Sequence, residues 1–381
     1  MKILLYSGAF GSNNFGDDAL LVSHVRVLNK IFPSAELLIA DLKSNYYQKL
    51  LDPRDKVRVI QPGEKPDVFI FAGGTQFHGL PRKKAFTTLN LCNLIGSVRK
   101  ELGRELYFYR RRKVMTSSTF AAAIGVGVGP FADDTKLEKD RAILSALDFV
   151  AVRDQNSINV CDNWGLGQVI LGSDLCFYPG TWARPKLSSI NQATSAVKKI
   201  GFIVRDWPFE NQGSDYKESL LKTVDTLRTA GIADVSFISF RSHNRAGRDF
   251  EWLETLQSRN EKDILTWDPW EMSLNSFSSE LSKFDCIITA RYHGAVFAAL
   301  FGIPFICVGI EPKLLMVAEA LKNTNHLWAS PYDPDQLSNA IKYNLLNDEN
   351  VKHELLKYCE AEGAKAIEMM QALSHELSNA V

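Results

Sequence analysis

Arg291 and His293 are the residues whose types and position point most directly to chemistry. They stand in "CIITARYHGAVFAALFGIPFICVG" (286–309), where a polar turn separates a short apolar strand from an apolar helix and a second buried strand. The first N–H groups of a helix lack intrahelical partners and carry partial positive charge, so an anion is favoured there. A guanidinium and an imidazole would strengthen a phosphate or carboxylate site. An arginine paired with a nearby carboxylate, beside a histidine packed in a turn, is an equally good interpretation of this stretch alone.

Other charged side chains are expected at the ends of neighbouring strands. They occur in "GFIVRDWP" and "VGIEPKL" and are Arg205, Asp206, Glu311 and Lys313. Because parallel strands end at one edge of a sheet, we expect Arg205, Arg291, His293 and Lys313 to converge. Cations held in one small volume repel each other unless an anion lies among them. The pattern therefore predicts a ligand that carries phosphate or carboxylate.

The loop "GAFGSNNFGDDAL" (8–20) places three glycines between the first strand and the first helix. Glycine lets a backbone approach a ligand closely and point N–H groups at it. The spacing is neither the dinucleotide fingerprint nor a P-loop. Asn13 and Asn14 are typical of left-handed turns, so a purely structural loop remains an alternative.

Two further glycine motifs, "FAGGTQF" (71–77) and "GVGVGP" (125–130), are predicted to be strand-end turns that form a floor for a ligand. Arg153 and Asp154 in "VRDQNS" are expected to form an exposed ion pair of little energetic value. Asp174 follows a buried strand, where it would cap a helix or contact substrate.

Several kinds of site find no support in the sequence. There is no Zn-ligand spacing, no H-E-x-x-H and no G-x-S-x-G motif, so neither a metal site nor a catalytic triad is predicted. Lys plus Arg and Asp plus Glu number 44 each, which gives no reason to expect nucleic acid as a partner. The six cysteines form no regular framework and are expected to be reduced, buried thiols of a cytosolic protein.

Membrane contact rests on one segment. Arg110, Arg111, Arg112 and Lys113 follow three aromatic residues, either as a solvated helix end or as a surface for an anionic lipid headgroup or polyanionic acceptor. The apolar start, 1–11, reads as a strand rather than a signal peptide, and glycine and proline interrupt the longer uncharged runs. No transmembrane helix is predicted.

The elements that position these residues alternate between strands and helices. Apolar runs without strict alternation indicate parallel sheets covered on both faces. We predict two doubly wound, Rossmann-like α/β domains that face each other across a cleft, with the boundaries 1–180, a linker at 181–198, and 199–333. Residues 334–381 are predicted to form amphipathic helices that pack over a domain.

The ordered motifs resemble the polysaccharide pyruvyl transferase family. They are "GSNNFGDDAL", "FAGGTQF", "GVGVGPF", "VRDQNS...NWG...VILGSD", "VRDW" and, above all, "ARYHGAVFAALFGIPF" followed by Lys313. The resemblance runs from Gly8 to about Lys313. The first motif departs from the family pattern of Gly-Asn and Gly-Asp-Glu, because Asn13-Asn14 and Gly16-Asp17-Asp18 stand there.

The resemblance implies a GT-B-like fold and transfer of pyruvate from phosphoenolpyruvate to two hydroxyls of a sugar, which leaves a ketal. No cofactor is implied beyond phosphoenolpyruvate as co-substrate. The acceptor would belong to an exopolysaccharide or another cell-envelope polysaccharide, free or linked to a lipid. A cytoplasmic location is expected, at the inner face of the membrane if the acceptor is linked to a lipid.

Site roles follow from the same resemblance. The donor would be bound in the domain 199–333 by Arg205, Arg291, His293, Lys313 and Glu311. The catalytic residues would be His293, Arg291 and Asp206. The domain 1–180 would bind the acceptor through Asn14, Gly16, Asp17, Asp18 and Gly74. Two alternatives stay open: a nucleotide-sugar glycosyltransferase of the same fold, with Glu311 as its acidic ligand contact, and a catalytically silent glycan-binding protein.

Overall fold

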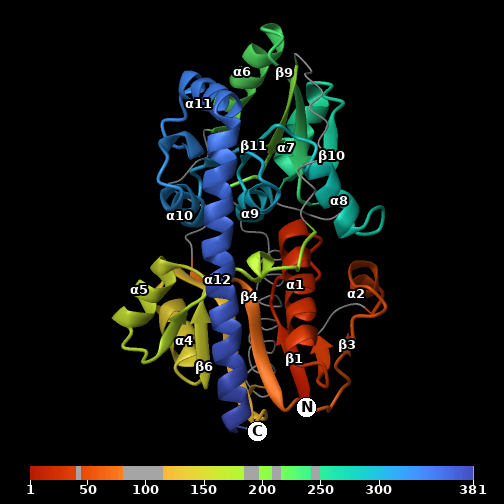
Figure 1. Cartoon of the computed structure of the whole chain (residues 1–381), viewed down its shortest axis with the longest axis vertical. Helices are drawn as coiled ribbons and strands as arrows, with labels where there is room; N and C mark the ends of the chain where they lie inside the picture. The colour runs from red at the N-terminus through yellow and green to blue at the C-terminus, as the bar shows by residue number, and fades with distance from the viewer. Residues whose placement is uncertain (40–43, 80–114, 184–196, 208–215, 242–248, 381) are drawn as a thin grey trace, which may run out of the picture.

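The computed structural model describes residues 1–39, 44–79, 115–183, 197–207, 216–241 and 249–380. Within these ranges the chain forms two parallel sheets covered by helices, one body above the other in Figure 1. The predicted pair of doubly wound α/β domains is confirmed. The basic run 110–113 lies outside the described residues, so both interpretations of it remain predictions.

The first sheet has seven parallel strands in the order β3-β2-β1-β4-β5-β6-β7. They are β1 (Lys2–Tyr6), β2 (Glu36–Ile39), β3 (Val57–Val59), β4 (Val68–Gly79), β5 (Phe120–Phe131), β6 (Phe149–Val152) and β7 (Val169–Leu171). The chain starts in the middle at β1, winds outward to β3 and returns to β4. The winding direction therefore changes between β1 and β4, beyond whose carboxyl ends ligands of such sheets bind.

The second sheet repeats this plan with six parallel strands in the order β10-β9-β8-β11-β12-β13. They are β8 (Lys198–Ile203), β9 (Ala233–Ser239), β10 (Ile264–Thr266), β11 (Cys286–Thr289), β12 (Phe305–Val308) and β13 (Leu327–Trp328). Here the winding changes direction between β8 and β11. The predicted boundaries at 180 and 199 stay predictions, since residues 184–196 between the sheets lie outside the described ranges.

Helices cover both faces of each sheet. They are α1 (Phe15–Ile31), α2 (Ser44–Leu50), α4 (Asp134–Leu144), α5 (Gln155–Asn163), α6 (Tyr216–Thr229), α7 (Phe250–Ser258), α8 (Leu274–Leu281), α9 (Tyr292–Phe301), α10 (Pro312–Ala320), α11 (Pro334–Leu346) and α12 (Asp348–Ala380), with a 3₁₀ turn, η1, at Leu175–Phe177. Within the described ranges, none of these helices has the length and hydropathy that a membrane span requires.

Burial on both faces explains why the strands are continuous apolar runs. Along β1, Ile3 and Leu5 join a core that contains α1 and continues into the second domain. Leu4 and Tyr6 join a separate core under α4 and α5. Successive side chains of a strand point to opposite faces, so an alternating pattern appears only where one face is solvated.

The two predicted strand-end turns are wrong. "FAGGTQF" and "GVGVGP" lie inside β4 and β5, which continue to Gly79 and Phe131. Gly73 and Gly74 adopt φ of +56° and +72°, and the pairing of β4 with β5 changes register just beyond them. Glycine reaches such backbone angles without a Cβ penalty, so these strands bend without ending. The added length carries their polar ends toward the second domain.

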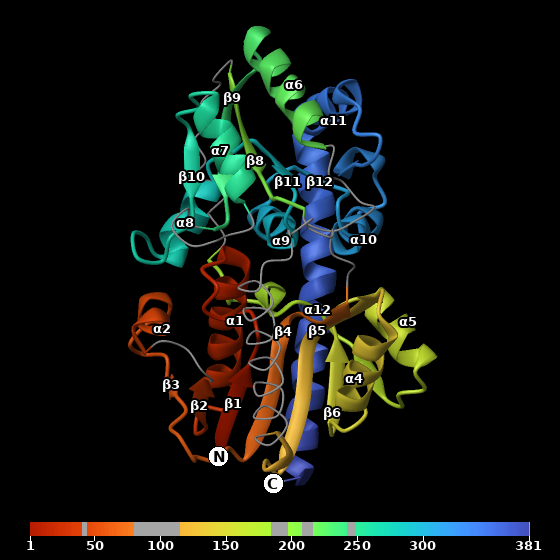
Figure 2. The ribbon, with the colours of Figure 1, turned by 180° about the vertical axis from the view of Figure 1, so that it is seen from behind.

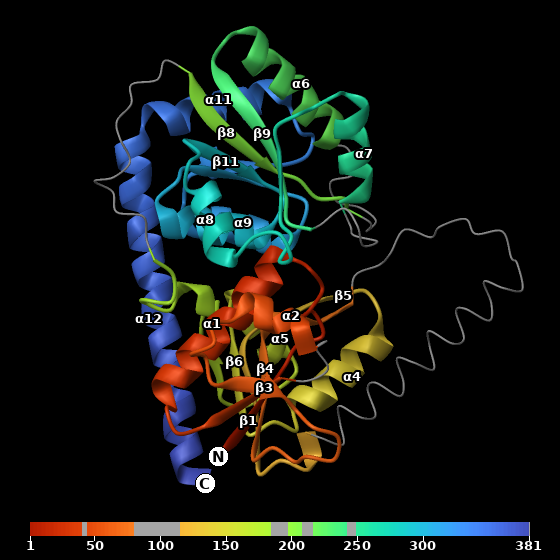
Figure 3. The same cartoon turned by 90° about the vertical axis from the view of Figure 1, so that its right-hand side faces the viewer.

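The long helix α12 joins the two domains. It packs against α9 and α11 of the second domain and against β5, β6, β7 and η1 of the first. Figures 2 and 3 show it running along one side of both bodies, with the C-terminus beside the first sheet. The sequence predicts tail helices over a domain, whereas α12 covers parts of both, because its apolar positions continue through all of its 33 residues.

Candidate functional site

A cleft of about 850 Å³ lies between the domains, at the edge where both sheets change winding direction. The first domain lines it with the ends of β1, β4 and β5, the start of α1 and one face of α5. The second domain lines it with residues that follow β8, β9, β11 and β12. This is the position at which open parallel sheets bind ligands.

Arg205 and Arg291 reach the cleft for the same structural reason. Ile203 of β8 pairs with Thr289 of β11, and each arginine stands two residues beyond its strand's paired residue. Both arginines are buried and line the cleft together with His293 and Lys313. The predicted convergence of these four side chains therefore occurs in the structure.

Glu311 is the counter-ion of two of these cations. Its carboxylate accepts a hydrogen bond of 2.7 Å from Arg205 Nη1, and its other oxygen lies 3.3 Å from Lys313 Nζ. Burial alone would raise the pKa of Glu311, but the two cations hold it below its ordinary value. Burial lowers the pKa of Lys313 to about 8, although Glu311 opposes this effect. Glu311 thus holds the cations in place at the cleft.

Arg291 is also paired within the protein. Its Nη2 donates to Asp249, which is fully buried, and its Nε lies 3.4 Å from the Val204 carbonyl oxygen. Burial lowers the pKa of Arg291, and Asp249 opposes that effect. Nothing in the sequence indicated that Asp249 pairs with Arg291, because the two residues are 42 positions apart.

Because these carboxylates offset the positive charge, the cations repel one another less than expected. Some of the cations' hydrogen-bond donors nevertheless have no acceptor in the described ranges. The Nε–H groups of Arg205 and Arg241 are buried without a hydrogen-bond acceptor in the described part of the chain. Both residues line the cleft. A buried, charged donor without an acceptor is costly, so a ligand that brings acceptor oxygens would relieve the cost.

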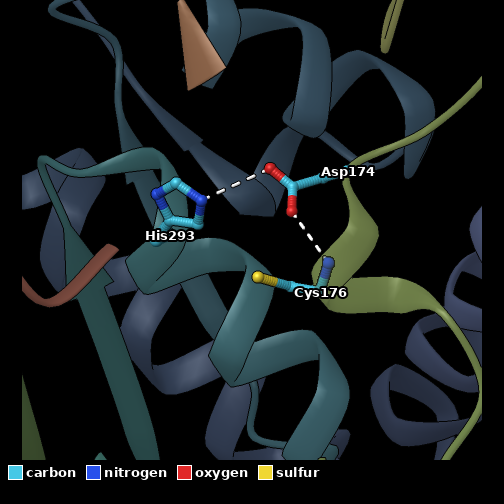
Figure 4. Close-up of side chains that lie close together, drawn as sticks. All are labelled: Asp174, Cys176 and His293. Carbon is cyan, nitrogen blue, oxygen red and sulfur yellow. Dashed lines mark hydrogen bonds and ion pairs between the residues drawn. The ribbon is translucent and has the colours of Figure 1, made fainter. Parts of the chain in front are cut away.

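His293 forms an ion pair with a residue of the other domain. Its Nε2 lies 3.3 Å from Oδ2 of Asp174, which is fully buried beyond β7 (Figure 4). The other oxygen, Oδ1, accepts from the backbone N–H of Cys176 at 3.0 Å, so Asp174 does cap a helical turn as well. Burial would raise the pKa of Asp174, but the charges of His293 and Arg153 hold it below its ordinary value.

Arg153 is a site residue that was not predicted. It is buried rather than exposed, and it lies over the ring of Tyr292 at 4.6 Å. Its Nη2 donates to Thr75 at 2.7 Å, and Nη1 lies 3.9 Å from Asp174. The signal was present: Val-Arg-Asp follows β6 as it follows β8, where Arg205 was recognised. Arg153 therefore adds a first-domain cation to the cleft.

One group of side chains in the described ranges could offer a metal three ligands. The ligand atoms of Asp174, Cys176 and His293 lie within 4.8 Å of one another. However, burial raises the pKa of the Cys176 thiol well above its ordinary value, and the Arg153 guanidinium shares the Asp174 carboxylate. A metal would need a thiolate and would be repelled by the guanidinium, so the group fits an ion pair better.

The start of α1 serves mainly as a contact between the domains. Phe15 is fully buried, and its backbone N–H donates to the Phe240 carbonyl at 3.0 Å. Its ring packs, with centroid distances of 4.7–5.6 Å, against Phe240, Trp267, Phe277 and Phe297 of the second domain. Of the predicted acceptor residues, Asn14, Gly16, Asp17 and Gly74 do line the cleft.

Two predicted site residues lie outside the cleft lining. Asp18 is fully buried and accepts hydrogen bonds of 2.8 Å from the Tyr46 hydroxyl and Trp267 Nε1, which explains why no acceptor sugar can reach it. Asp206 accepts from the backbone N–H groups of Glu251 and Trp252, at the start of α7. Asp206 thus stabilises a helix terminus, and the proposed catalytic role for it is not supported by its position.

The fold is similar to those of several solved structures. Among solved structures, the Anabaena protein HepE in complex with UDP-glucose matches with a TM-score of 0.59 and 13% identity, over 98% of this chain and 100% of that one. The S. aureus protein MnaA in complex with UDP matches with a TM-score of 0.58 and 15% identity, over 100% and 97%. A Listeria monocytogenes protein described as a putative UDP-N-acetylglucosamine 2-epimerase matches with a TM-score of 0.53 and 13% identity, over 99% and 97%. These likenesses show the GT-B-like fold.

At the level of sequence, no curated protein matches the chain. A family model does match it: the model described as polysaccharide pyruvyl transferase covers residues 14–312. That range includes Arg153, Arg205, Arg291, His293 and Glu311 of the cleft, whereas the end of β1 and Lys313 lie just outside it. The chain belongs to the polysaccharide pyruvyl transferase family.

Proposed function

We propose that the chain transfers pyruvate from phosphoenolpyruvate to two hydroxyls of one sugar in a polysaccharide or its precursor. The observation that carries this proposal is the set of cleft cations, of which Arg205 and Arg241 keep buried Nε–H groups without an acceptor in the described part of the chain. Phosphoenolpyruvate has a phosphate and a carboxylate on three carbons, so it can engage several cations at once.

The reaction balances without a further reactant. A proton adds to the methylene carbon of phosphoenolpyruvate, and one sugar hydroxyl attacks the resulting cationic carbon. Phosphate then leaves as the second hydroxyl closes the ring. Of the two hydroxyl protons, one is accounted for by the new methyl group and the other by the released phosphate. The product is a cyclic ketal that keeps the carboxylate.

The residues have distinct proposed roles. Arg205, Arg291 and Lys313 hold the two anionic groups of the donor, and Glu311 keeps Arg205 and Lys313 in position. His293 contacts the phosphate and transfers a proton, with the Asp174 carboxylate behind it. We also propose that the protein works in the cytoplasm, because all five cysteines in the described ranges are free and buried, as predicted.

The test uses phosphoenolpyruvate labelled with ¹³C in its three carbons and a set of glycan acceptors. We expect mass spectrometry to find the label in the glycan, with one inorganic phosphate released for each pyruvate transferred. Lys313→Ala should lower this turnover strongly because it removes a cleft cation. Lys342→Ala is the matched control, since Lys342 is exposed on α11 and lies outside the cleft lining.

The same experiment separates the two alternatives. A nucleotide-sugar glycosyltransferase of this fold would turn over only with a nucleotide sugar and would leave the ¹³C label in unreacted phosphoenolpyruvate. A catalytically silent glycan-binding protein would bind glycan but transfer no label, in the wild type as in Arg291→Ala and His293→Ala. Either result would contradict the proposal.

A further inference from the structure

The wall of the cleft formed by the first domain carries an unusual number of carboxamide side chains. Those that line it are Asn14, Gln76, Asn156, Asn159 and Asn163. A carboxamide both donates and accepts hydrogen bonds and carries no charge. Sugar hydroxyls have the same dual capacity. The facing wall of the second domain, in contrast, presents arginine and lysine.

Three of these side chains form one face of α5. Asn156, Asn159 and Asn163 have the spacing i, i+3 and i+7, which brings them to the same side of a helix. All three are exposed, and all three line the cleft. Seven residues of helix correspond to about 10 Å, which is longer than one sugar ring. The row starts three residues after Arg153 and therefore leads away from the cations. Figure 2 shows α5 at the end of the first domain that faces the second.

The asparagines are not needed to hold α5 in place. The Asp154 side chain caps the helix by accepting from the Ser157 N–H, and the Ser157 hydroxyl accepts from Val128 N–H of β5. Asn159 accepts a hydrogen bond from Gln155 within the helix. Asparagine lowers helix propensity, so a row of three in nine residues is unfavourable unless a ligand uses it.

Two buried oxygens on the same wall have unused capacity. Asn14 Oδ1 and Gln76 Oε1 are buried, and neither accepts a hydrogen bond from any residue that the structure describes. Both amides donate within the protein, Asn14 to Asp17 and Gln76 to the Gly73 carbonyl. An unpaired buried acceptor costs on the order of 1–3 kcal/mol, which a hydroxyl donor from a ligand would offset.

Two of the charged groups on this wall are held by the protein itself. Lys136 is paired with Asp140, which lies on the same helix. Asp17 accepts from Ser12 and Asn14. Arg153 keeps a buried Nε–H without an acceptor in the described ranges, and it precedes the amide row. The row itself carries no charge, which favours an uncharged ligand along it.

We infer that the amide row on α5, with Gln76 and Asn14 at its inner end, is the acceptor subsite and takes an uncharged oligosaccharide of at least two sugar rings. That this glycan is the acceptor of the reaction rests on the proposed function, whereas the affinity for neutral sugars does not. The reacting sugar lies at the Asn156 end, near Arg153 and His293. The next sugar lies along Asn159 and Asn163.

The experiment measures glycan binding with the whole protein, without turnover. The probes are neutral galactose, glucose and mannose glycans of one, two and four sugars, titrated by saturation-transfer NMR. Wild type should bind one glycan series more tightly as its length grows from one to two sugars. Asn163→Ala should weaken the disaccharide and tetrasaccharide about tenfold and leave the monosaccharide unchanged, while Asn156→Ala should weaken all three. Asp162→Ala is the matched control, because Asp162 is exposed next to Asn163 but does not line the cleft.

The proposal is overturned if wild type binds no neutral glycan better as a disaccharide than as a monosaccharide. It is also overturned if Asn163→Ala binds as wild type does. A parallel calorimetric titration with phosphoenolpyruvate separates this result from the proposed function. Binding of phosphoenolpyruvate with an unchanged glycan series for Asn163→Ala would refute only the subsite. The expected glycan series without binding of phosphoenolpyruvate would refute only the donor.

Discussion

The starts of α1 and α9 meet at the cleft. Each helix follows a strand and a loop, but the two starts have different roles. At α1, Phe15 is enclosed by aromatic rings of the second domain, and Asp18 is buried under Trp267. At α9, Arg291 and His293 reach into the cleft, where buried carboxylates hold them. The α1 start therefore fastens the domains together, whereas the α9 start prepares a ligand site.

A helix terminus rich in polar residues is therefore not by itself a ligand site. The residues of the first helical turn decide, because they determine whether the terminus is covered. Apolar Phe15 directs the α1 start into the neighbouring domain, while Gly294 of α9 packs closely against Thr289 of β11 and keeps the helix on its own sheet. Four substitutions should test this difference between the two helix starts.

Phe15→Ala should have the largest effect. The side chain is fully buried among four aromatic residues, so its truncation should cost about 3–5 kcal/mol of unfolding free energy. Urea denaturation would measure the loss. Phe32→Ala at the other end of α1 is the control, since Phe32 is only partly buried and should cost less than half as much. Equal losses would mean that the α1 start is not a special contact.

Gly16→Ala should come next and should act on activity rather than stability. A Cβ at Gly16 would lie 2.3 Å from Nδ1 of His293, so the imidazole has to move. Displacement of a reacting group by about 1 Å costs roughly a hundredfold in rate. Gly167→Ala is the control, because a Cβ there meets no atom within 4 Å. Full activity in Gly16→Ala would show that the position of His293 does not matter for turnover.

Asp174→Asn should reduce the rate by at least about tenfold, since the side chain keeps its shape but loses the charge that faces His293. Asp162→Asn on the exposed side of α5 should leave the rate unchanged. Steady-state kinetics measure both rates, and urea denaturation shows whether each variant stays folded. A full rate in Asp174→Asn would contradict a role for this charge in turnover.

Asp18→Asn should change a different property, the dependence of stability on pH. Burial raises the pKa of Asp18 to about 7, so the folded chain keeps a proton that the unfolded chain releases near pH 4. This contribution to stability is complete below pH 4 and is lost as the pH rises to 7, by up to about 1.4 kcal/mol for each pH unit. Urea denaturation at pH 5 and 7.5 should show a flatter dependence in Asp18→Asn. An unchanged slope would contradict the raised pKa.

Much of the fold could be predicted from the sequence because it depends on local pattern. Continuous apolar runs that end in Gly or charged residues gave two parallel sheets, and strand order then brought Arg205 and Arg291 to one edge. The family could also be predicted, since the motifs at these strand ends occur in a fixed order. Burial of both sheet faces makes such signals strong.

The missed parts depend on distant partners. Asp249 holds Arg291, but nothing in its own neighbourhood in the sequence indicates this. Asp174 was expected to cap a helix or contact substrate, but its pairing with His293 was not expected because the two residues lie in different domains. Arg153 was expected to be exposed. It is buried and stacks on Tyr292, and the sequence does not indicate this stacking because it is a contact between domains. The extension of β4 beyond Gly74 was missed because a double glycine usually ends a strand. The contacts of Asp174 and Arg153 cross the cleft, whereas those of Asp249 and the length of β4 concern packing within one domain.

The most direct test of the central claim is a crystal structure of the protein soaked with phosphoenolpyruvate. We expect density for the donor in the cleft, with its anionic groups on Arg205, Arg291 and Lys313 and its methylene carbon next to His293. Density on the amide face of α5 instead, or no density in the cleft at a saturating concentration, would contradict it.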